Sequence, residues 1–221
     1  MPNFISVIFD FDYTLADSSD GVEECVNYAL NALSFDPQPR ENICRTIGLS
    51  LPQTFEALTG VTSVALQERF AHVFLFRADQ VMVDLTRMYD GVEDTLAALK
   101  AHGLKLGIVS TKNRYRIERI LHRDGILDLF DKIVGGEDVD VHKPDPAGML
   151  KAMSWLGMRP SKTIYVGDSV VDAKTAERSH VNFIAVLTGT TPREELERYY
   201  PYRIFHNINE IPPFLERVMT E

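Results

Sequence analysis

The chain has little cysteine and no long apolar run. Of its 221 residues only Cys25 and Cys44 are cysteines, and they do not form a Cys-x-x-Cys pair. Neither a disulfide framework nor a zinc site is therefore indicated. No stretch approaches the roughly 18 uninterrupted apolar residues of a membrane helix, and the amino terminus lacks the features of a signal peptide. We expect a protein of the reducing cytoplasm.

Basic blocks are also absent. The 23 Lys and Arg residues against 32 Asp and Glu residues give a net charge of −9. This balance argues against nucleic acid or an anionic membrane as the main partner, although an acidic chain can still bind phosphate locally. The composition itself, 45% hydrophobic and 25% charged, is ordinary for a globular protein that can bury a full core.

The apolar run at residues 4–9 ends in two carboxylates, Asp10 and Asp12. Consecutive apolar side chains suit a strand buried on both faces of a parallel sheet, and open α/β sheets bind ligands at the carboxyl ends of their strands. Carboxylates this close repel one another unless a cation or a shared proton relieves them. The motif therefore indicates a divalent metal site or a nucleophile with an acid/base partner, although an Asp-x-Asp motif can also simply end a strand.

Strand-like segments alternate with helical patterns through most of the chain. After the first strand they fall at residues 104–109, 132–134, 163–166, 183–187 and 202–205. This alternation predicts an α/β fold with a Rossmann-like, doubly wound parallel sheet.

Residues 16–86 interrupt that alternation. They carry helical spacing throughout and no convincing strand, and they are far longer than the crossover of about a dozen residues that a parallel pair needs. We interpret them as a helical subdomain inserted into an α/β unit of residues 1–15 and 87–221.

Further reactive side chains follow other strands or lie in loops at the same edge of the predicted sheet. They are Ser110, Thr111, Lys143, Asp168 and Asp172. Taken singly, each has a plain alternative: the hydroxyls can cap a helix, lysine is usually solvated, and aspartates are favourable near a helix amino end. Together with Asp10 and Asp12 they predict one crevice that collects all of them.

These residues also resemble a known family. The resemblance rests on four motifs in the expected order: Asp10-x-Asp12-x-Thr14, the apolar strand into Ser110, Lys143 in Lys-Pro-x-Pro, and Gly167-Asp168-Ser169-x-x-Asp172. They resemble those of the haloacid dehalogenase-like hydrolase superfamily. The helical subdomain of residues 16–86 resembles the small α-helical cap domain of its phosphoglycolate phosphatase-like enzymes and β-phosphoglucomutases, which implies that residues 1–15 and 87–221 form the catalytic core. One departure is Tyr13, which stands where phosphatases of the superfamily usually have glycine.

The resemblance and the chemistry of phosphoryl transfer imply roles for these residues. Asp10 would be the nucleophile and Asp12 the general acid and base. Mg²⁺ would be held by the side chains of Asp10 and Asp168 and by the backbone carbonyl of Asp12, with Asp172 as a ligand or a support. Phosphate would bind to Ser110, to the amide of Thr111 and to Lys143.

The expected function is Mg²⁺-dependent hydrolysis of a small-metabolite phosphomonoester through an aspartyl phosphate. In the cap, Arg45 could reach a second anionic group of the substrate. A phosphomutase would use the same nucleophile and acid, and a phosphate-responsive binding module resembling a response-regulator receiver would gather similar groups. The substrate and the choice between monomer and homodimer are left open.

Overall fold

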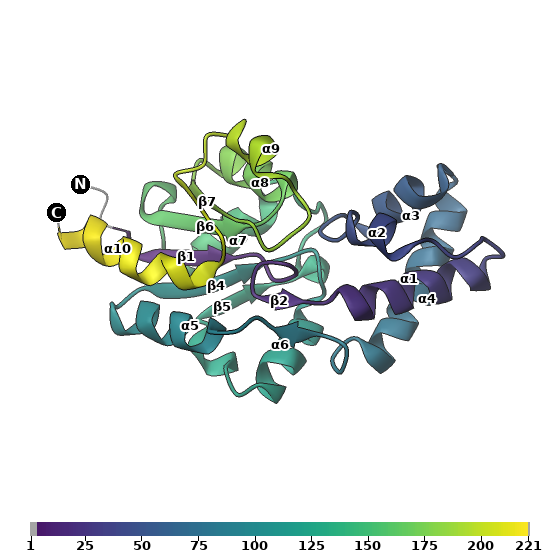
Figure 1. Ribbon diagram of the computed structural model, residues 1–221, viewed down its shortest axis with the longest axis horizontal. Coiled ribbons are helices and arrows are strands. Elements are labelled where there is room, and N and C mark those ends of the chain that lie inside the picture. The colour runs from purple at the N-terminus through teal and green to yellow at the C-terminus, as the bar shows by residue number, and fades with distance from the viewer. Residues whose placement is uncertain (1–3, 221) are drawn as a thin grey trace.

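The structure, a computed structural model, describes residues 4–220, which form an α/β body with a helical cap at one end (Figure 1). A six-stranded parallel sheet with the order β5-β4-β1-β6-β7-β8 runs through the body. Its strands are β1 (Ser6–Phe9), β4 (Lys105–Val109), β5 (Lys132–Val134), β6 (Thr163–Gly167), β7 (Asn182–Val186) and β8 (Arg203–Phe205). The predicted doubly wound sheet is confirmed.

Helices cover both faces of this sheet (Figure 1). On one face lie α5 (Val92–Ala101), α6 (Arg114–Arg123) and α10 (Ile211–Thr220), and on the other α7 (Ala147–Leu156), α8 (Val170–Ser179) and α9 (Arg193–Glu197). Short 3₁₀ turns complete the body: η1 (Leu127–Leu129), η2 (Gly136–Asp138), η3 (Pro160–Lys162) and η4 (Ile208–Glu210).

The first strand shows why the apolar residues run consecutively. Val7 and Phe9 pack into the core beneath α5, α6 and α10, whereas Ile8 packs into the core beneath α7 and α8. All three side chains are fully buried. A central strand between two helical layers has no polar face, so alternation disappears.

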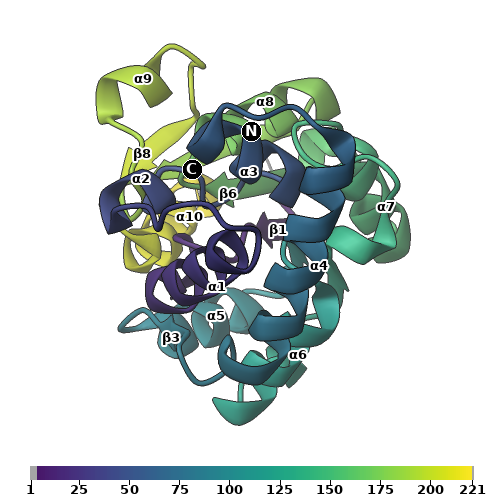
Figure 2. The same cartoon turned by 90° about the vertical axis from the view of Figure 1, so that its right-hand side faces the viewer.

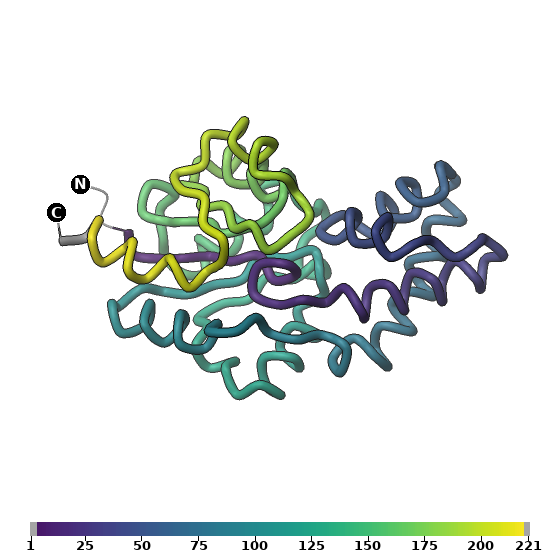
Figure 3. The backbone as a smooth tube through the Cα atoms, viewed as in Figure 1, coloured from purple at the N-terminus to yellow at the C-terminus, as the bar shows by residue number. Residues whose placement is uncertain are grey.

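The cap is built from α1 (Ser19–Ala32), α2 (Arg40–Cys44), α3 (Leu51–Thr59) and α4 (Val64–Val81). It has a hydrophobic core of its own, formed by Cys25, Val26, Ala29, Leu30, Ile43, Phe55, Phe70, Phe74, Ala78 and Met82. Figure 2 views this helical group end-on. The chain enters and leaves the cap side by side (Figure 3), through β2 (Ala16–Asp17) and β3 (Arg87–Met88), which pair antiparallel. The sequence did not predict this ribbon.

A polar contact between α4 and α6 joins the cap to the body. Asp79 on α4 receives a hydrogen bond of 2.5 Å from the Tyr115 hydroxyl and lies 2.7 Å from the guanidinium of Arg116. The side chain of Arg116 is only 3% exposed and also donates to the Leu75 carbonyl at 3.0 Å. The buried guanidinium of Arg116 is therefore paired with the carboxylate of Asp79 and also hydrogen-bonded to the backbone of α4.

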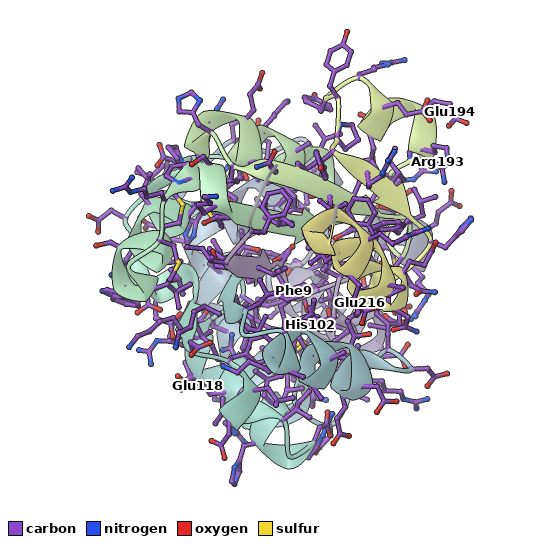
Figure 4. All side chains as sticks on the ribbon, turned by 90° about the vertical axis from the view of Figure 1, so that its left-hand side faces the viewer. Phe9, His102, Glu118, Arg193, Glu194 and Glu216 are labelled. Carbon is purple, nitrogen blue, oxygen red and sulfur yellow. The ribbon has the colours of Figure 1, made fainter. Side chains whose placement is uncertain are left out.

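Figure 4 views the opposite end of the molecule, where α10 packs beside α5. His102 Nε2, just after α5, lies 3.2 Å from Glu216 Oε1 on α10. Within the described part of the chain, no helix combines the length and the apolar character needed to cross a bilayer.

Candidate active site

Three neighbouring strands of the sheet bring the predicted reactive residues to one edge. Asp10 follows β1, Ser110 follows β4 and Asp168 follows β6, and β1 lies between the other two strands. All three side chains are at most 6% exposed. The parallel arrangement makes these strand ends coincide, so side chains far apart in the sequence meet at one place.

Lys143 lies at the centre of this group. Its Nζ is 2.9 Å from Asp10 Oδ1 and 2.7 Å from Asp172 Oδ1, and it donates to the Tyr165 hydroxyl at 3.0 Å. Burial by itself lowers the pKa of Lys143, but the negative charges of Asp10 and Asp172 outweigh that effect and raise it above its usual value. The amine therefore stays protonated and supplies a fixed positive charge beside Asp10.

Asp172 is held from several directions. Its Oδ1 accepts a hydrogen bond of 2.8 Å from the Tyr165 hydroxyl, and its Oδ2 accepts from the backbone and the hydroxyl of Ser169 at 3.1 and 2.5 Å. Ser169 accepts in turn from the Asp172 amide, which makes a reciprocal cap at the start of α8. Tyr165, which the sequence reasoning did not single out, thus fixes Asp172 relative to Lys143.

The carboxylates at this edge fit a hard divalent cation. Oxygen atoms of Asp10, Asp168 and Asp172 lie within 4.8 Å of one another, and all three residues are buried. Asp10 Oδ1 has no hydrogen bond of good geometry, although the Lys143 amine is 2.9 Å away as an ion-pair partner. A donor set made only of carboxylate oxygens is the chemistry that Mg²⁺ prefers.

The pKa values of Asp10 and Asp168 are both raised, as expected for buried carboxylates that lie close together. Burial raises the pKa of Asp10 to about 6, and the charge of Asp172 adds to this while Lys143 opposes it. Burial, followed by the charges of Asp172 and Asp10, raises the pKa of Asp168 well above its usual value. A bound cation would relieve this cost, because it stabilises the ionised carboxylates.

Asp168 is enclosed by two loops of the body. The Thr14 hydroxyl donates to Asp168 Oδ1 at 3.2 Å. On the other side, a Cβ atom added to Gly189 would collide with Asp168 Oδ2, so the loop after β7 approaches closely only because residue 189 is glycine. Sequence patterns around residue 189 gave no sign of this contact.

A second buried lysine, which the sequence reasoning missed, holds Asp12. Lys112 Nζ lies 2.8 Å from Asp12 Oδ1 and 3.0 Å from its Oδ2, and the two side chains are 6% and 9% exposed. The Lys112 amide also donates to Ser110 Oγ at 3.3 Å. In the sequence, the only indication of this role for Lys112 is its position directly after Ser110 and Thr111, at the end of a strand.

Tyr13 adopts the conformation that explains why glycine is usual in this turn. Its φ of 60° lies in the left-handed region, which costs a residue with a side chain about 1–3 kcal/mol. The amide of Tyr13 donates to the Ala16 carbonyl at 2.7 Å, and its carbonyl accepts from the Thr188 hydroxyl. The turn therefore does accommodate a bulky side chain, which is 8% exposed.

The remaining two predicted residues differ in where they lie. The Thr111 hydroxyl donates to the Gly48 carbonyl of the cap at 3.4 Å, so Thr111 lies between body and cap. Arg45 does not reach the site: its side chain is 65% exposed and its guanidinium pairs with Glu41 Oε1 at 2.6 Å. The structure brings together the predicted residues of the body but not Arg45, because α2 turns that side chain to solvent.

A cavity of about 320 Å³ separates the body from the cap next to these residues. Asp12, Thr111 and Lys112 line it on the body side. On the cap side it is bounded mainly by apolar side chains, among them Val22, Ile47, Leu49, Leu51, Phe74, Leu75 and Met82. The cavity thus begins beside Asp12 and extends under the cap.

Known proteins resemble this chain over nearly its whole length. A phosphoglycolate phosphatase from Cereibacter sphaeroides is 32% identical over 225 residues, which cover 97% of this chain and 99% of that protein. A pyrophosphatase PpaX from Bacillus mycoides is 29% identical, with 96% of this chain and 97% of that protein covered. A Bacteroides fragilis crystal structure described as a haloacid dehalogenase-like hydrolase superposes with a TM-score of 0.92 at 39% identity, covering 94% of this chain and 99% of that one.

The model of one family matches residues 7–186, from the first strand through the cap to β7. That range includes Asp10, Asp12, Ser110, Lys143 and Asp168, which the fold gathers at one edge of its sheet. The chain therefore belongs to the haloacid dehalogenase-like hydrolase family.

Proposed function

We propose that the protein is a Mg²⁺-dependent phosphatase that hydrolyses the phosphomonoester of a small metabolite through an aspartyl phosphate on Asp10. The observation that carries the proposal is the buried Asp10 carboxylate, with one oxygen lacking a hydrogen bond and the Lys143 amine 2.9 Å from it. Relatives named phosphoglycolate phosphatase and pyrophosphatase support a phosphorylated substrate.

Asp10 is the nucleophile of the first step. With a pKa of about 6, it is mostly ionised at neutral pH and can attack phosphorus. Lys143 offsets the charge that accumulates near the attacking and transferring oxygens, and the Ser110 hydroxyl can donate to a phosphoryl oxygen. Because Asp172 and Tyr165 hold Lys143, this positive charge is already oriented before substrate binds.

The cation would be held by Asp10, Asp168 and the backbone carbonyl of Asp12, and Asp172 would support it. When bound, Mg²⁺ supplies positive charge that stabilises the transferring phosphoryl group. Thr14 and the loop at Gly189 keep Asp168 oriented toward the other carboxylates.

Asp12 is the proton donor to the leaving oxygen and then the base that activates water against the aspartyl phosphate. Its carboxylate borders the cavity under the cap, where a leaving alcohol can lie. Lys112 contacts both of its oxygens and so fixes the direction of the carboxylate. General acid–base catalysis of this kind is typically worth about 10²–10⁴-fold in rate.

One experiment tests both aspartate roles. Asp10→Asn, Asp12→Asn and the exposed control Asp94→Asn are incubated with Mg²⁺ and acetyl phosphate or p-nitrophenyl phosphate, and intact mass is recorded. The leaving groups of these activated substrates depart without a proton, so Asp10 can still be phosphorylated in Asp12→Asn. Because this variant lacks the base that activates water, one phosphate adduct should accumulate. Asp10→Asn should form none, and the control should turn over substrate like the wild type.

Loss of all reaction in both variants alike, or an adduct on another residue, would contradict the proposed roles. In separate reactions, the wild type is incubated with Mg²⁺ and sugar phosphates, and both free phosphate and isomerised sugar phosphate are measured. Isomerisation would identify a phosphomutase. A stable phosphoprotein without turnover in the wild type would instead favour a receiver-like binding module.

A further inference from the structure

The cavity under the cap indicates what kind of leaving group the enzyme accepts. We propose that the substrate's leaving alcohol carries an uncharged apolar body, alkyl or aryl, which occupies this cavity. The inference rests on the proposed phosphatase function and adds the chemical class of substrate.

The position of Asp12 sets where the leaving group lies. Asp12 donates a proton to the leaving oxygen, so that oxygen must be next to its carboxylate. Asp12 and Lys112 line the cavity at the body end, and from there the cavity extends toward α3 and α4 of the cap. The atoms attached to the leaving oxygen therefore enter the cavity. Its volume of about 320 Å³ is at the lower end of the range of about 300–1,000 Å³ for small-molecule pockets.

The cap contributes only uncharged residues to the cavity lining described here. Most of them are apolar, among them Ile47, Leu49, Leu51, Phe74, Leu75 and Met82. Ile47 and Leu49 are partly buried but lie outside the hydrophobic core of the cap as the described residues define it. Their side chains are therefore available to cover an apolar ligand rather than needed to hold the cap together.

Charge in the lining is already balanced. The two cationic residues there, Lys112 and Arg116, lie 2.8 Å from Asp12 and 2.7 Å from Asp79. The lining also contains Glu137, which accepts from the Arg114 amide at 2.7 Å. A carboxylate or second phosphate on the leaving group would thus lose hydration without meeting an unpaired cation among the described lining residues. Arg45, the cap cation expected to serve this purpose, points to solvent.

The test compares kcat/KM for ethyl, propyl, butyl and pentyl phosphate with that for 2-phosphoglycolate. These alkyl leaving groups are similarly basic and differ only in apolar length. Burying one methylene group is worth about a fourfold change, so kcat/KM should rise about 60-fold over the three methylene groups from ethyl to pentyl phosphate. 2-Phosphoglycolate should be hydrolysed no faster than ethyl phosphate. A rise below tenfold, or a preference for 2-phosphoglycolate, overturns the inference.

Variants locate the effect in the cavity. Leu49→Asn and Ile47→Asn should each lower the pentyl-to-ethyl ratio of kcat/KM at least threefold, because an amide now faces the alkyl chain. Val64→Asn, which changes a cap side chain that is 65% exposed, should leave the ratio unchanged. Unchanged ratios in both cavity variants, with melting temperatures near that of the wild type, overturn the inference. Phosphate release from none of the esters would instead refute the proposed function.

Discussion

At the scale of single residues, two buried lysines at the site are paired with different carboxylates. Lys143 faces Asp10 and Asp172, next to the proposed nucleophile, whereas Lys112 faces Asp12, next to the cavity. Buried lysines are rare unless they are paired, and each of these is paired with carboxylates of the site. In the proposed mechanism, Lys143 therefore lies beside the carboxylate that accepts the phosphoryl group, and Lys112 lies beside the proton donor.

Lys112→Met should affect substrates according to how much they need a proton. For ethyl phosphate, kcat/KM should fall about 10–100-fold, because Asp12 loses the partner that orients it toward the leaving oxygen. For p-nitrophenyl phosphate, whose leaving group departs without a proton, the fall should stay within about threefold. Steady-state kinetics with both esters measures the difference, and Lys105→Met on the exposed end of β4 is the control. Equal losses for both substrates would show that Lys112 has another role.

The convergence of Asp10, Asp12, Ser110, Lys143, Asp168 and Asp172 could be predicted because five of them follow strands of one parallel sheet or begin the next helix. The sequence did not identify Lys112, Tyr165 or Gly189. Their importance depends on which partner lies opposite them in the folded chain, and that information is absent from local pattern. Arg45 shows the same limit, since its place in the sequence does not indicate that its side chain is 65% exposed and pairs with Glu41.

At the scale of elements, Asp131 ties α5 to β4. It accepts from Lys100 at 2.9 Å, from Lys105 at 3.0 Å and from the Leu106 amide at 2.9 Å. Burial by itself would raise the pKa of Asp131, but these three donors outweigh it and hold the pKa below its usual value. Since the folded state favours the ionised form, this stability is present at neutral pH and is lost as the pH falls through the folded pKa.

Asp131→Asn should therefore lower the free energy of unfolding by about 1–3 kcal/mol at pH 7, the usual range for hydrogen bonds to a charged group. The loss should remain constant down to about pH 5 and shrink below pH 4, where the wild-type carboxylate also becomes protonated. Urea unfolding at several pH values measures it, with the exposed Asp128→Asn as the control. A loss that grows on acidification would mean that Asp131 is not ionised in the native state.

The sequence predicted the six strands of the sheet but not the β2–β3 ribbon. Five of the six strands have runs of buried apolar side chains, and β8 has the apolar pair Ile204 and Phe205, which is partly buried. Such runs are visible without any partner. Each strand of the ribbon has only two residues, and a pair such as Ala16 and Asp17 has no detectable period. Its existence depends on the cap bringing Arg87 and Met88 back beside residues 16 and 17.

At the scale of the whole molecule, the crowded carboxylates make stability sensitive to a cation. We expect Mg²⁺ to bind the native state, where Asp10 and Asp168 are close, far better than the unfolded chain. At about 100 times its Kd it should add about 2.7 kcal/mol, which raises Tm by about 5–10 °C for a chain of this size. Thermal unfolding with Mg²⁺ or excess chelator measures this without any substrate.

Asp168→Asn should abolish most of that rise, and the exposed Asp36→Asn should keep it. The same Mg²⁺-dependent rise in wild type and in Asp168→Asn would mean that the ion binds elsewhere on the protein. This outcome would separate the proposed metal site from general effects of salt on an acidic chain.

The ribbon that joins cap and body also bears on how such a protein can be assembled. Ala16 pairs with Met88 and Asp17 pairs with Arg87, so the helical insertion begins and ends at one and the same residue pair, Asp17 with Arg87. The β2–β3 pair holds the two ends of the insertion together, as the strands of a hairpin hold the ends of its loop. Since loop length alters closure entropy only slowly, one cap can be exchanged for another of different size while the catalytic edge of the sheet stays intact. In the proposed mechanism, the cavity under the cap and the phosphoryl-transfer site of the body meet at Asp12.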